Sequence, residues 1–493
     1  MKPNPDVRDS LREAFCNLPG VAAQENLTPP GPGELYVPDS HTKALNLDTT
    51  VVVGMRGAGK SVWTAALFDN ATRQRLVGAG APATLQDAYV RVGFSNDPHK
   101  GHHPDSDTLG TLLEHEPEPR HIWRGVLARK LAEVCDLPSP AVRFDEAARW
   151  AREDPEAFNE LLGEAASILK QKEKYLLLVF DSLDTTAPGS WENVRALTRG
   201  ALEVALACRP YPNIRLKFFI RPDMEEDEGV FDFRDSSKLL HNRVDLTWRP
   251  VDLYGLLFHT LVNGPASEVF LPLAECITGL NWSWVDGFYR VPDKLRGNEK
   301  AQRPLLEALT GPYMGANHRR GYTYTWITGH LADAHGRIAP RSLLLALRQA
   351  ATITSEKSPE YPYPLQYEAI KRGVAEASDT RVRELSKEDY PWVTPLLMRL
   401  KDMTVPLEIH ELVKKWNQSV LEEVLQVSEE KLPPRRFSSA PAHSRDIEML
   451  IDDLEELGVL YRTGDGRINI PDIFRVGFGI RRKGGVRPPK RGM

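Results

Sequence analysis

The chain has 493 residues, of which 41% are hydrophobic and 27% are charged, the composition of an ordinary soluble globular protein. A chain of this length is expected to form two to four domains, because one hydrophobic core rarely extends over so many residues. Its formal net charge of −5 argues against a protein that binds nucleic acid over its whole surface, although a local basic arm remains compatible with it.

Hydropathy and cysteine usage predict a cytoplasmic protein with no membrane partner. No apolar run reaches the roughly 18–20 residues that span a bilayer, and the first ten residues lack the apolar core of a secretory signal. The four cysteines lie far apart and form no C-x-x-C pair, which disfavours a structural zinc site or a disulfide framework.

After an N-terminal segment over residues 1–34, the stretch 51–61 reads VVVGMRGAGKS. Three valines predict a short buried strand, and the G-x-x-x-x-G-K-S that follows is the spacing of a phosphate-binding loop. Glycines let successive N–H groups face phosphate oxygens, and the next helix adds its positive N-terminal end. The expected nucleotide contacts are Gly54, Arg56, Gly57, Ala58, Gly59, Lys60, Ser61 and Val62. A glycine-rich turn without a ligand is the structural alternative.

Two side chains of this loop have specific expected roles. Lys60 is expected to reach the β- and γ-phosphates of ATP, and the Ser61 hydroxyl to bind Mg²⁺. ATP and Mg²⁺ are therefore the predicted cofactors.

A second buried strand is predicted at Tyr175–Phe180, within KYLLLVFDSLDTT. Its unbroken apolar run is typical of a parallel strand covered on both faces, and Asp181 follows at the end where open α/β sheets bind ligands. We expect Asp181 to be the second Mg²⁺ ligand. Asp184 is expected either to orient or deprotonate the attacking water or to cap a turn.

A third strand is predicted at Ile214–Ile220, and it ends at Arg221. If this strand lies beside the one that ends at Asp181, Arg221 emerges at the phosphate-binding edge and senses the γ-phosphate; otherwise it forms a surface salt bridge. The acidic residues that follow are predicted to form a solvated loop: Asp223, Glu225, Glu226, Asp227 and Glu228.

Further strands at Ala88–Phe94 and Val244–Trp248, alternating with helical segments, complete the pattern of an α/β fold with a doubly wound parallel sheet. The insert between Ser95 and Arg120 is polar and contains His99, His102 and His103. Neither a cysteine nor a spaced set of carboxylates completes a metal site there, so a plain loop is expected.

The P-loop, the D-x-x-D of Asp181 and Asp184, and the strand ending in Arg-Pro together resemble the signal-transducing ATPases with numerous domains (STAND). Those belong, with the AAA+ proteins, to the additional-strand branch of P-loop ATPases. The resemblance covers about residues 35–350, and it implies an ATPase core at 35–250 in which Asp181 assists Mg²⁺ and Arg221 senses the nucleotide state. Members often carry a glutamate where this chain has Ser182 or Thr185, so slow hydrolysis, or hydrolysis that depends on Asp184, is expected.

A helical lid is expected over residues 251–352. Leucines at helical spacing begin it, and Pro340 is predicted to open a later helix whose first turn contains Arg341. In the related ATPases a lid arginine closes over the γ-phosphate, so the resemblance implies this role for Arg341, against a lid-surface ion pair. Arg319 and Arg320 are weaker candidates for a finger that reaches a neighbouring subunit.

The rest of the chain is predicted to comprise a Pro/Tyr-rich spacer at 353–384, a winged-helix-like domain at 385–475 and a basic tail at 476–493. Helices near 392–401, 407–416 and 446–457 precede a hairpin that turns at Gly464-Asp465-Gly466. The end of the chain has no acidic side chain, and a flexible arm that binds DNA phosphates competes there with a solubilising or docking tail. Its basic residues are Arg475, Arg481, Arg482, Lys483, Arg487, Lys490 and Arg491.

Three functions compete on these features. The first is an ATP-hydrolysing switch coupled to DNA association or to bacterial defence or regulation. The second is a nucleotide-gated signalling scaffold with little turnover, whose winged helix binds a partner protein or a second copy. The third is a small-molecule kinase, which shares the P-loop but leaves the lid and the wing unexplained.

Overall fold

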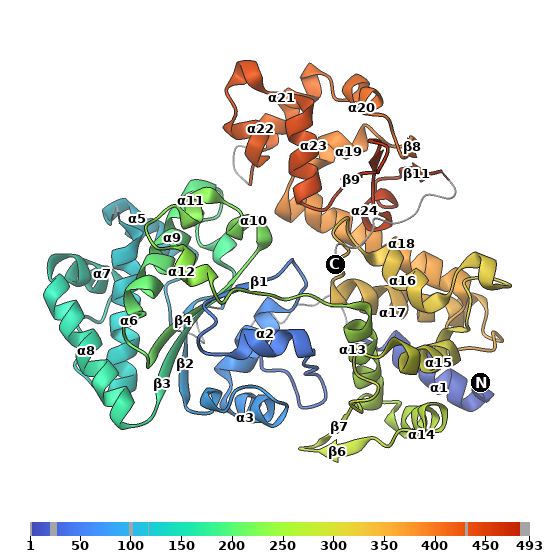
Figure 1. Cartoon of the computed structure of the whole chain (residues 1–493), viewed down its shortest axis with the longest axis horizontal. Helices are drawn as coiled ribbons and strands as arrows, with labels where there is room; N and C mark the ends of the chain where they lie inside the picture. The colour runs from blue at the N-terminus through green and yellow to red at the C-terminus, as the bar shows by residue number, and fades with distance from the viewer. Residues whose placement is uncertain (1, 20–26, 98–101, 117, 429–431, 484–493) are drawn as a thin grey trace. The chain divides into compact units, whose positions relative to one another are not determined.

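The computed structural model describes residues 2–19, 27–97, 102–116, 118–428 and 432–483. The chain divides into one unit at Ala23–Thr247 and a second that combines Met1–Ala22 with Trp248–Met493 (Figure 1). The finer division into six segments stays a prediction. Among the described residues, no helix is long and apolar enough to cross a membrane.

The first unit is built on a five-stranded sheet in the order β2-β3-β4-β1-β5, in which every pairing is parallel. Its strands are β1 (Val51–Val53), β2 (Ala88–Phe94), β3 (Tyr175–Phe180), β4 (Ile214–Ile220) and β5 (Val244–Asp245). The first four have their predicted bounds, and β5 ends three residues earlier than predicted. β4 pairs with both β1 and β3, so Arg221 and Asp181 follow neighbouring strands.

Helices cover both faces of the sheet, which confirms the doubly wound fold (Figure 1). Strand side chains alternate between two cores: Val52 and Val179 belong to one, and Val51 and Leu178 to the other. On the Val52 face lie α2 (Lys60–Phe68) and α3 (Asn70–Gly78). On the opposite face lie α5 (Ser106–His115), α6 (Pro119–Cys135), α7 (Phe144–Glu153), α8 (Pro155–Gln171) and α9 (Trp191–Cys208).

The polar insert after Ser95 is not a plain loop, because it contains α5, whose N-terminus is capped by Asp105. Leu109 and Leu112 of α5 belong to the core and Leu113 packs against it, an i, i+3, i+4 spacing that is typical of a helix but stands in a polar segment. His103 is buried, with Nε2 3.1 Å from the Ser95 hydroxyl. His99 lies outside the described residues.

A buried lysine attaches the chain before β1 to the sheet. Lys217 of β4 is fully buried, and its ammonium donates to the carbonyl oxygens of Ala44 (2.8 Å), Asn46 (2.9 Å) and Thr49 (2.6 Å). These carbonyls end the 3-10 helix η1 (Asp39–Leu45) and lead into β1. Burial lowers the pKa of Lys217 to about 7.

The second unit begins with α1 (Pro5–Cys16), which packs on α17 (Pro340–Lys357). Buried Arg12 of α1 donates to the carbonyl oxygens of Pro359 (2.9 Å) and Pro364 (3.0 Å), so it holds the Pro/Tyr-rich segment that follows α17. The other elements before residue 385 are α13 (Pro250–Val262), α14 (Ser267–Thr278), β6 (Ser283–Val285), β7 (Phe288–Arg290), α15 (Glu299–Thr310), η4 (His318–Arg320), α16 (Thr323–Leu331) and α18 (Tyr367–Glu384).

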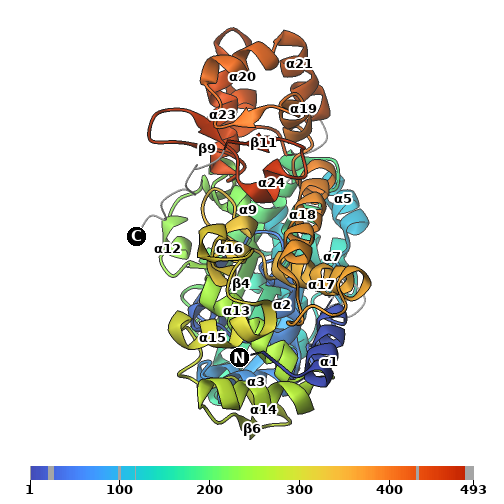
Figure 2. The same ribbon diagram turned by 90° about the vertical axis from the view of Figure 1, so that its right-hand side faces the viewer.

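The C-terminal part contains the predicted hairpin, with β9 (Tyr461–Arg462) antiparallel to β10 (Ile468–Asn469) next to α23 (Ile447–Glu456) (Figure 2). The three predicted helices are α19 (Val393–Met398), α20 (Ile409–Lys415) and α23. Helices absent from the prediction are α21 (Gln418–Val427), α22 (Arg435–Ser439) and α24 (Asp472–Arg475). Leu407, after β8 (Thr404–Val405), bridges to Ile468. The comparison with a winged helix stays a prediction.

The described part of the tail is folded, contrary to the flexible arm that its composition predicts. β11 (Arg481–Arg482) pairs in parallel with β8, and Lys483 N donates to Val405 O at 2.8 Å. Arg487, Lys490 and Arg491 lie outside the described residues.

Replacing Lys217 by Met should lower the free energy of unfolding by about 2–4 kcal/mol, because the carbonyl groups of Ala44, Asn46 and Thr49, of which those of Ala44 and Thr49 are buried, lose their donor. Urea denaturation measures this loss. The control is Arg91→Met, which removes a half-buried cation of β2 that pairs with Glu133 of α6 and should cost under about 1 kcal/mol.

Above pH 7 the unfolded chain keeps a proton that folded Lys217 has released, so the stability difference between wild type and Lys217→Met should increase from pH 7 to pH 9.

Candidate nucleotide-binding site

The loop between β1 and α2 has the curled backbone that its glycines predict. Gly54 N donates to Ile220 O at 3.0 Å, and Gly57 and Gly59 have φ of 78° and 100°, values that favour glycine. Gly59 is the N-cap of α2, so the helix points its free N–H groups into the loop. Arg56 and Ala58 lie in this curl, and Ser61 and Val62 lie in the first turn of α2.

Lys60 lies across the loop that precedes it. Its ammonium donates to Gly54 O at 2.7 Å and to Met55 O at 3.3 Å. Burial lowers the pKa of Lys60, and the negative charges of Asp181 and Asp184 oppose that shift. The cation is therefore placed between the loop backbone and the carboxylates that follow β3.

Asp181 occupies the end of β3 and is 2% exposed. Its backbone N–H donates to Phe94 O at 3.0 Å, which fixes it to the end of β2. Burial raises the pKa of this carboxyl, against a hydrogen bond from the Ser61 side chain and the charge of Lys60. Its Oδ1 atom is buried and has no hydrogen-bond partner. A buried carboxylate oxygen without a partner, beside a serine hydroxyl, fits the oxygen ligands that Mg²⁺ requires.

The turn after Asp181 directs Asp184 toward Arg221. Ser182 has φ of 57°, and the turn η3 (Leu183–Thr185) is anchored by fully buried Leu183. Arg221 Nη1 lies 3.2 Å from Asp184 Oδ2, and its Nε lies 3.0 Å from Asp223 Oδ1. The Arg221 side chain is only 8% exposed, so this ion pair is not the surface salt bridge offered as the alternative. Its role in nucleotide sensing stays a prediction.

The acidic run after Arg221 is wrongly predicted as a solvated loop. It forms α10 (Pro222–Glu225) and α11 (Glu228–Phe231). Asp227 is buried and accepts from Trp191 Nε1 at 2.8 Å and Arg195 Nη2 at 2.8 Å, while Glu225 pairs with Arg243. Of the run, only Glu226 and Glu228 are exposed. The partners of Asp227 and Glu225 lie 18 or more residues away in the sequence, so charge pattern alone does not identify them.

Sequence reasoning also missed Asn96, just after β2. The Thr185 hydroxyl lies 2.6 Å from Asn96 Oδ1, so a polar pair connects the ends of β2 and β3. The signal was available, since a polar residue that follows a predicted parallel strand belongs at the ligand-binding edge.

Arg341 belongs to the second unit, in the first turn of α17 as predicted. It pairs with Glu384 of α18, which also accepts from Arg381 at 3.4 Å. An ion pair is thus observed for Arg341, and its role over the γ-phosphate stays a prediction.

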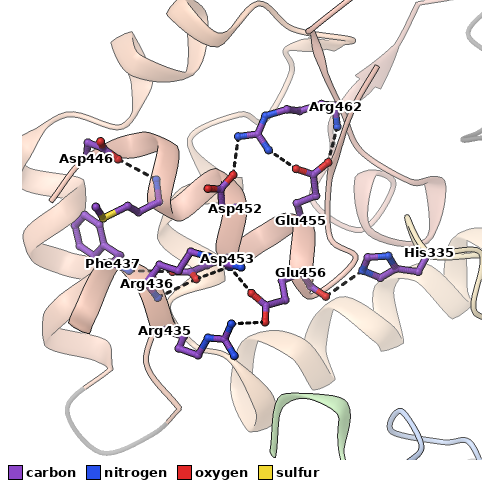
Figure 3. Close-up of polar contacts among 11 residues, drawn as sticks. His335, Arg435, Arg436, Phe437, Asp446, Asp452, Asp453, Glu455, Glu456 and Arg462 are labelled. Atoms are coloured by element: carbon purple, nitrogen blue, oxygen red, sulfur yellow. Dashed lines mark hydrogen bonds and ion pairs between the residues drawn. The ribbon is translucent and has the colours of Figure 1, made fainter. Parts of the chain in front are cut away.

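The C-terminal helix α23 is strongly acidic, and arginines from other elements neutralise part of its charge (Figure 3). Arg462 of β9 pairs with Glu448, Asp452 and Glu455. On another side, buried Asp453 accepts from Arg436 N at 3.0 Å. The described tail arginines are also paired: Arg475 and Arg482 with Asp472, and Arg481 with Asp402.

The segment before α17 is attached to the end of α23. Ala334 N donates to Gly458 O at 2.9 Å, and His335 Nε2 lies 3.0 Å from Glu456 O (Figure 3). Gly458 has φ of 74°, and a Cβ there would lie 2.8 Å from His335 Cδ2. The contact is thus restricted to glycine at that position.

Solved structures resemble this chain weakly. The ORC2 protein of Aeropyrum pernix, in complexes with ADPNP and ADP, is 13% identical with a TM-score of 0.39, over 94% of this chain and 96% of that one. A Walker-type ATPase of Pyrococcus abyssi is 12% identical with a TM-score of 0.37, over 92% and 97%. Cdc6p of Pyrobaculum aerophilum is 12% identical with a TM-score of 0.28, over 87% and 84%.

No protein-family model and no curated protein sequence matches the chain. At these identities and TM-scores, the function has to be argued from the site itself.

Arg221→Met should lower the free energy of unfolding by about 3 kcal/mol, since it leaves the carboxylates of Asp184 and Asp223 without their buried cation. The matched control is Arg195→Met. Its side chain is 40% exposed, and its partner Asp227 keeps other donors, so about 1 kcal/mol is expected. Chemical denaturation of both variants measures the difference, and equal losses would contradict the buried pairing of Arg221.

Proposed function

We propose that this protein is an ATP-binding and ATP-hydrolysing switch of the P-loop class. One observation carries the proposal: Lys60, Ser61 and Asp181 meet at the same edge of the sheet, and Asp181 has a buried oxygen without a partner. A ligand-free glycine-rich turn does not require a buried carboxylate there. The curled loop supplies backbone donors for phosphates, and Lys60 supplies the cation.

The residues divide the chemistry between them. Asp181 and Ser61 would hold Mg²⁺, which neutralises negative charge on the phosphate oxygens. Lys60 exchanges its contacts with Gly54 O and Met55 O for phosphate oxygens. Arg221, directly after β4, the strand between β1 and β3, is the candidate sensor of the γ-phosphate.

Slow turnover is part of the proposal. Ser182 and Thr185 carry no carboxylate, and Asp184 is engaged with Arg221, so no free general base stands in the described turn after β3. Thr185 and Asn96 are then the groups that can orient water there. The same observation favours the second candidate function, a nucleotide-gated scaffold that hydrolyses little.

The second part of the proposed function concerns the partner that the C-terminal region binds. In the described part of the tail, Arg475, Arg481 and Arg482 are paired with carboxylates, and α23 is acidic, so this described surface is a poor match for DNA phosphates. We therefore favour a protein partner or a second copy for the region of α23 and the β9–β10 hairpin. The winged-helix assignment rests on the pattern of helices followed by a hairpin at 385–475, and the STAND branch and a role in defence or regulation rest on the sequence resemblance over residues 35–350.

Lys60→Ala should weaken ATP binding at least about tenfold, because the phosphates lose their main cation. Asp181→Asn should keep ATP binding but abolish its dependence on Mg²⁺. Isothermal titration with ATP, with and without Mg²⁺, measures both effects. Lys170→Ala, on α8 away from the loop, is the matched control and should bind like wild type. Normal ATP hydrolysis by Lys60→Ala would show that the site is wrongly assigned.

Turnover by the purified chain separates the candidate functions. The ATPase switch requires multiple turnovers, slow but abolished in Asp181→Asn; the scaffold binds ATP and shows a nucleotide-dependent particle size with almost no product. Phosphate release measured with and without duplex DNA, together with light scattering, distinguishes these outcomes. A kinase would release little phosphate until a small acceptor molecule is added.

A further inference from the structure

The loop between α15 and α16 is closed by its own backbone. Tyr313 and Tyr322 form an antiparallel bridge, Met314 N donates to Gly321 O at 2.9 Å, and Thr323 N donates to Pro312 O at 3.1 Å. Met314 is fully buried, so its side chain anchors this loop to the interior. Residues 316–320 at the tip are exposed, so this is a fixed loop that presents its tip to solvent.

The tip is basic and has no nearby acid in the sequence. Residues 308–332 contain neither Asp nor Glu, and His318, Arg319 and Arg320 occur together. Within the described residues, neither arginine has a carboxylate partner within 4 Å. By contrast, even Arg481, with its side chain 70% exposed, pairs with Asp402. The aliphatic part of Arg320 packs against Gly315, whose absent Cβ would lie 2.7 Å from Arg320 Cγ.

An exposed aromatic ring lies at the base of the same loop. Tyr322 is 43% exposed, and its ring centroid lies 5.4 Å from that of Tyr313. The guanidinium of Arg303 lies 5.4 Å from the Tyr322 centroid and helps to hold the ring in place. Arg303 itself is neutralised by Glu299 at 2.7 Å, so the unneutralised cations of the loop are those of Arg319 and Arg320.

We propose that this loop, residues 311–322, binds single-stranded nucleic acid, with Arg319 and Arg320 on phosphates and Tyr322 stacked on a base. Two cations without carboxylates match a polyanion, and an exposed ring matches the flat face of a base. In a duplex the base faces are covered by their neighbours, so the ring favours a single strand. The inference stands independently of ATP binding, because it uses no residue of the P-loop.

Fluorescence anisotropy of the full chain with a labelled 20-nucleotide oligo-dT, and with a 20-base-pair duplex, tests the proposal. Arg319→Ala/Arg320→Ala should weaken oligo-dT binding at least about tenfold and reduce the slope of log K against log[salt] by about 1.4, or roughly 0.7 for each phosphate that is no longer neutralised. Tyr322→Ala should weaken it about fivefold or more, whereas Tyr322→Phe keeps the stacking face and should bind like wild type.

The matched control is Arg143→Ala/Arg383→Ala, which removes two positive charges with side chains 73% and 64% exposed and should leave binding unchanged. Circular dichroism checks that each variant folds; if the double-arginine variant does not, the Tyr322→Ala and Tyr322→Phe pair carries the test. Equal binding of duplex and oligo-dT, equal losses in the control, or tight binding of polyglutamate in place of oligo-dT would overturn the proposal.

Discussion

The pairing of β4 with both β1 and β3 is the constraint on which the candidate site depends. Because the strands are parallel, their carboxyl ends meet at one edge, and β4 sets Arg221 between the P-loop and Asp181. If β3 paired directly with β1, Arg221 would not stand between Asp184 and the P-loop. Lys217 of the same strand binds the carbonyl group of Thr49, in the segment that leads into β1. β4 thus holds the chain before β1 through Lys217, and at its carboxyl end it is followed by Arg221 and its partner Asp223.

Local patterns predicted the sheet well, because buried parallel strands read as short apolar runs with definite ends. Val51–Val53, Tyr175–Phe180 and Ile214–Ile220 all have their predicted bounds. Polar segments were harder. α5 falls in a segment predicted as a loop because its surroundings are polar, although Leu109, Leu112 and Leu113 have the i, i+3, i+4 spacing of a helix. α22 is only five residues long and buries one apolar side chain, Phe437, so it gives no periodic signal. Their helices are stabilised by packing on distant elements, which a single sequence does not reveal.

The candidate site shows the same limit for charge. Spacing identified Lys60, Ser61 and Asp181, since a phosphate-binding loop has few solutions. It did not show that Asp223 and Asp227 have buried partners. Nor did it show that the described tail arginines, Arg475, Arg481 and Arg482, are paired with carboxylates. A run of like charges has the same appearance in sequence whether its partners stand nearby in space or are missing. Only the three-dimensional neighbours separate structural ion pairs from cations left for a ligand.

The junction between residues 334–335 and the end of α23 has a mechanical consequence. The chain from Ala334 to Pro340 is short, and it connects this junction directly to the first turn of α17. A tilt of α17 that separated Arg341 from Glu384 would therefore strain the hydrogen bonds that Ala334 and His335 make with the carbonyl groups of Gly458 and Glu456. The second unit thus contains a short connection that ties the position of the first turn of α17 to the end of the acidic helix.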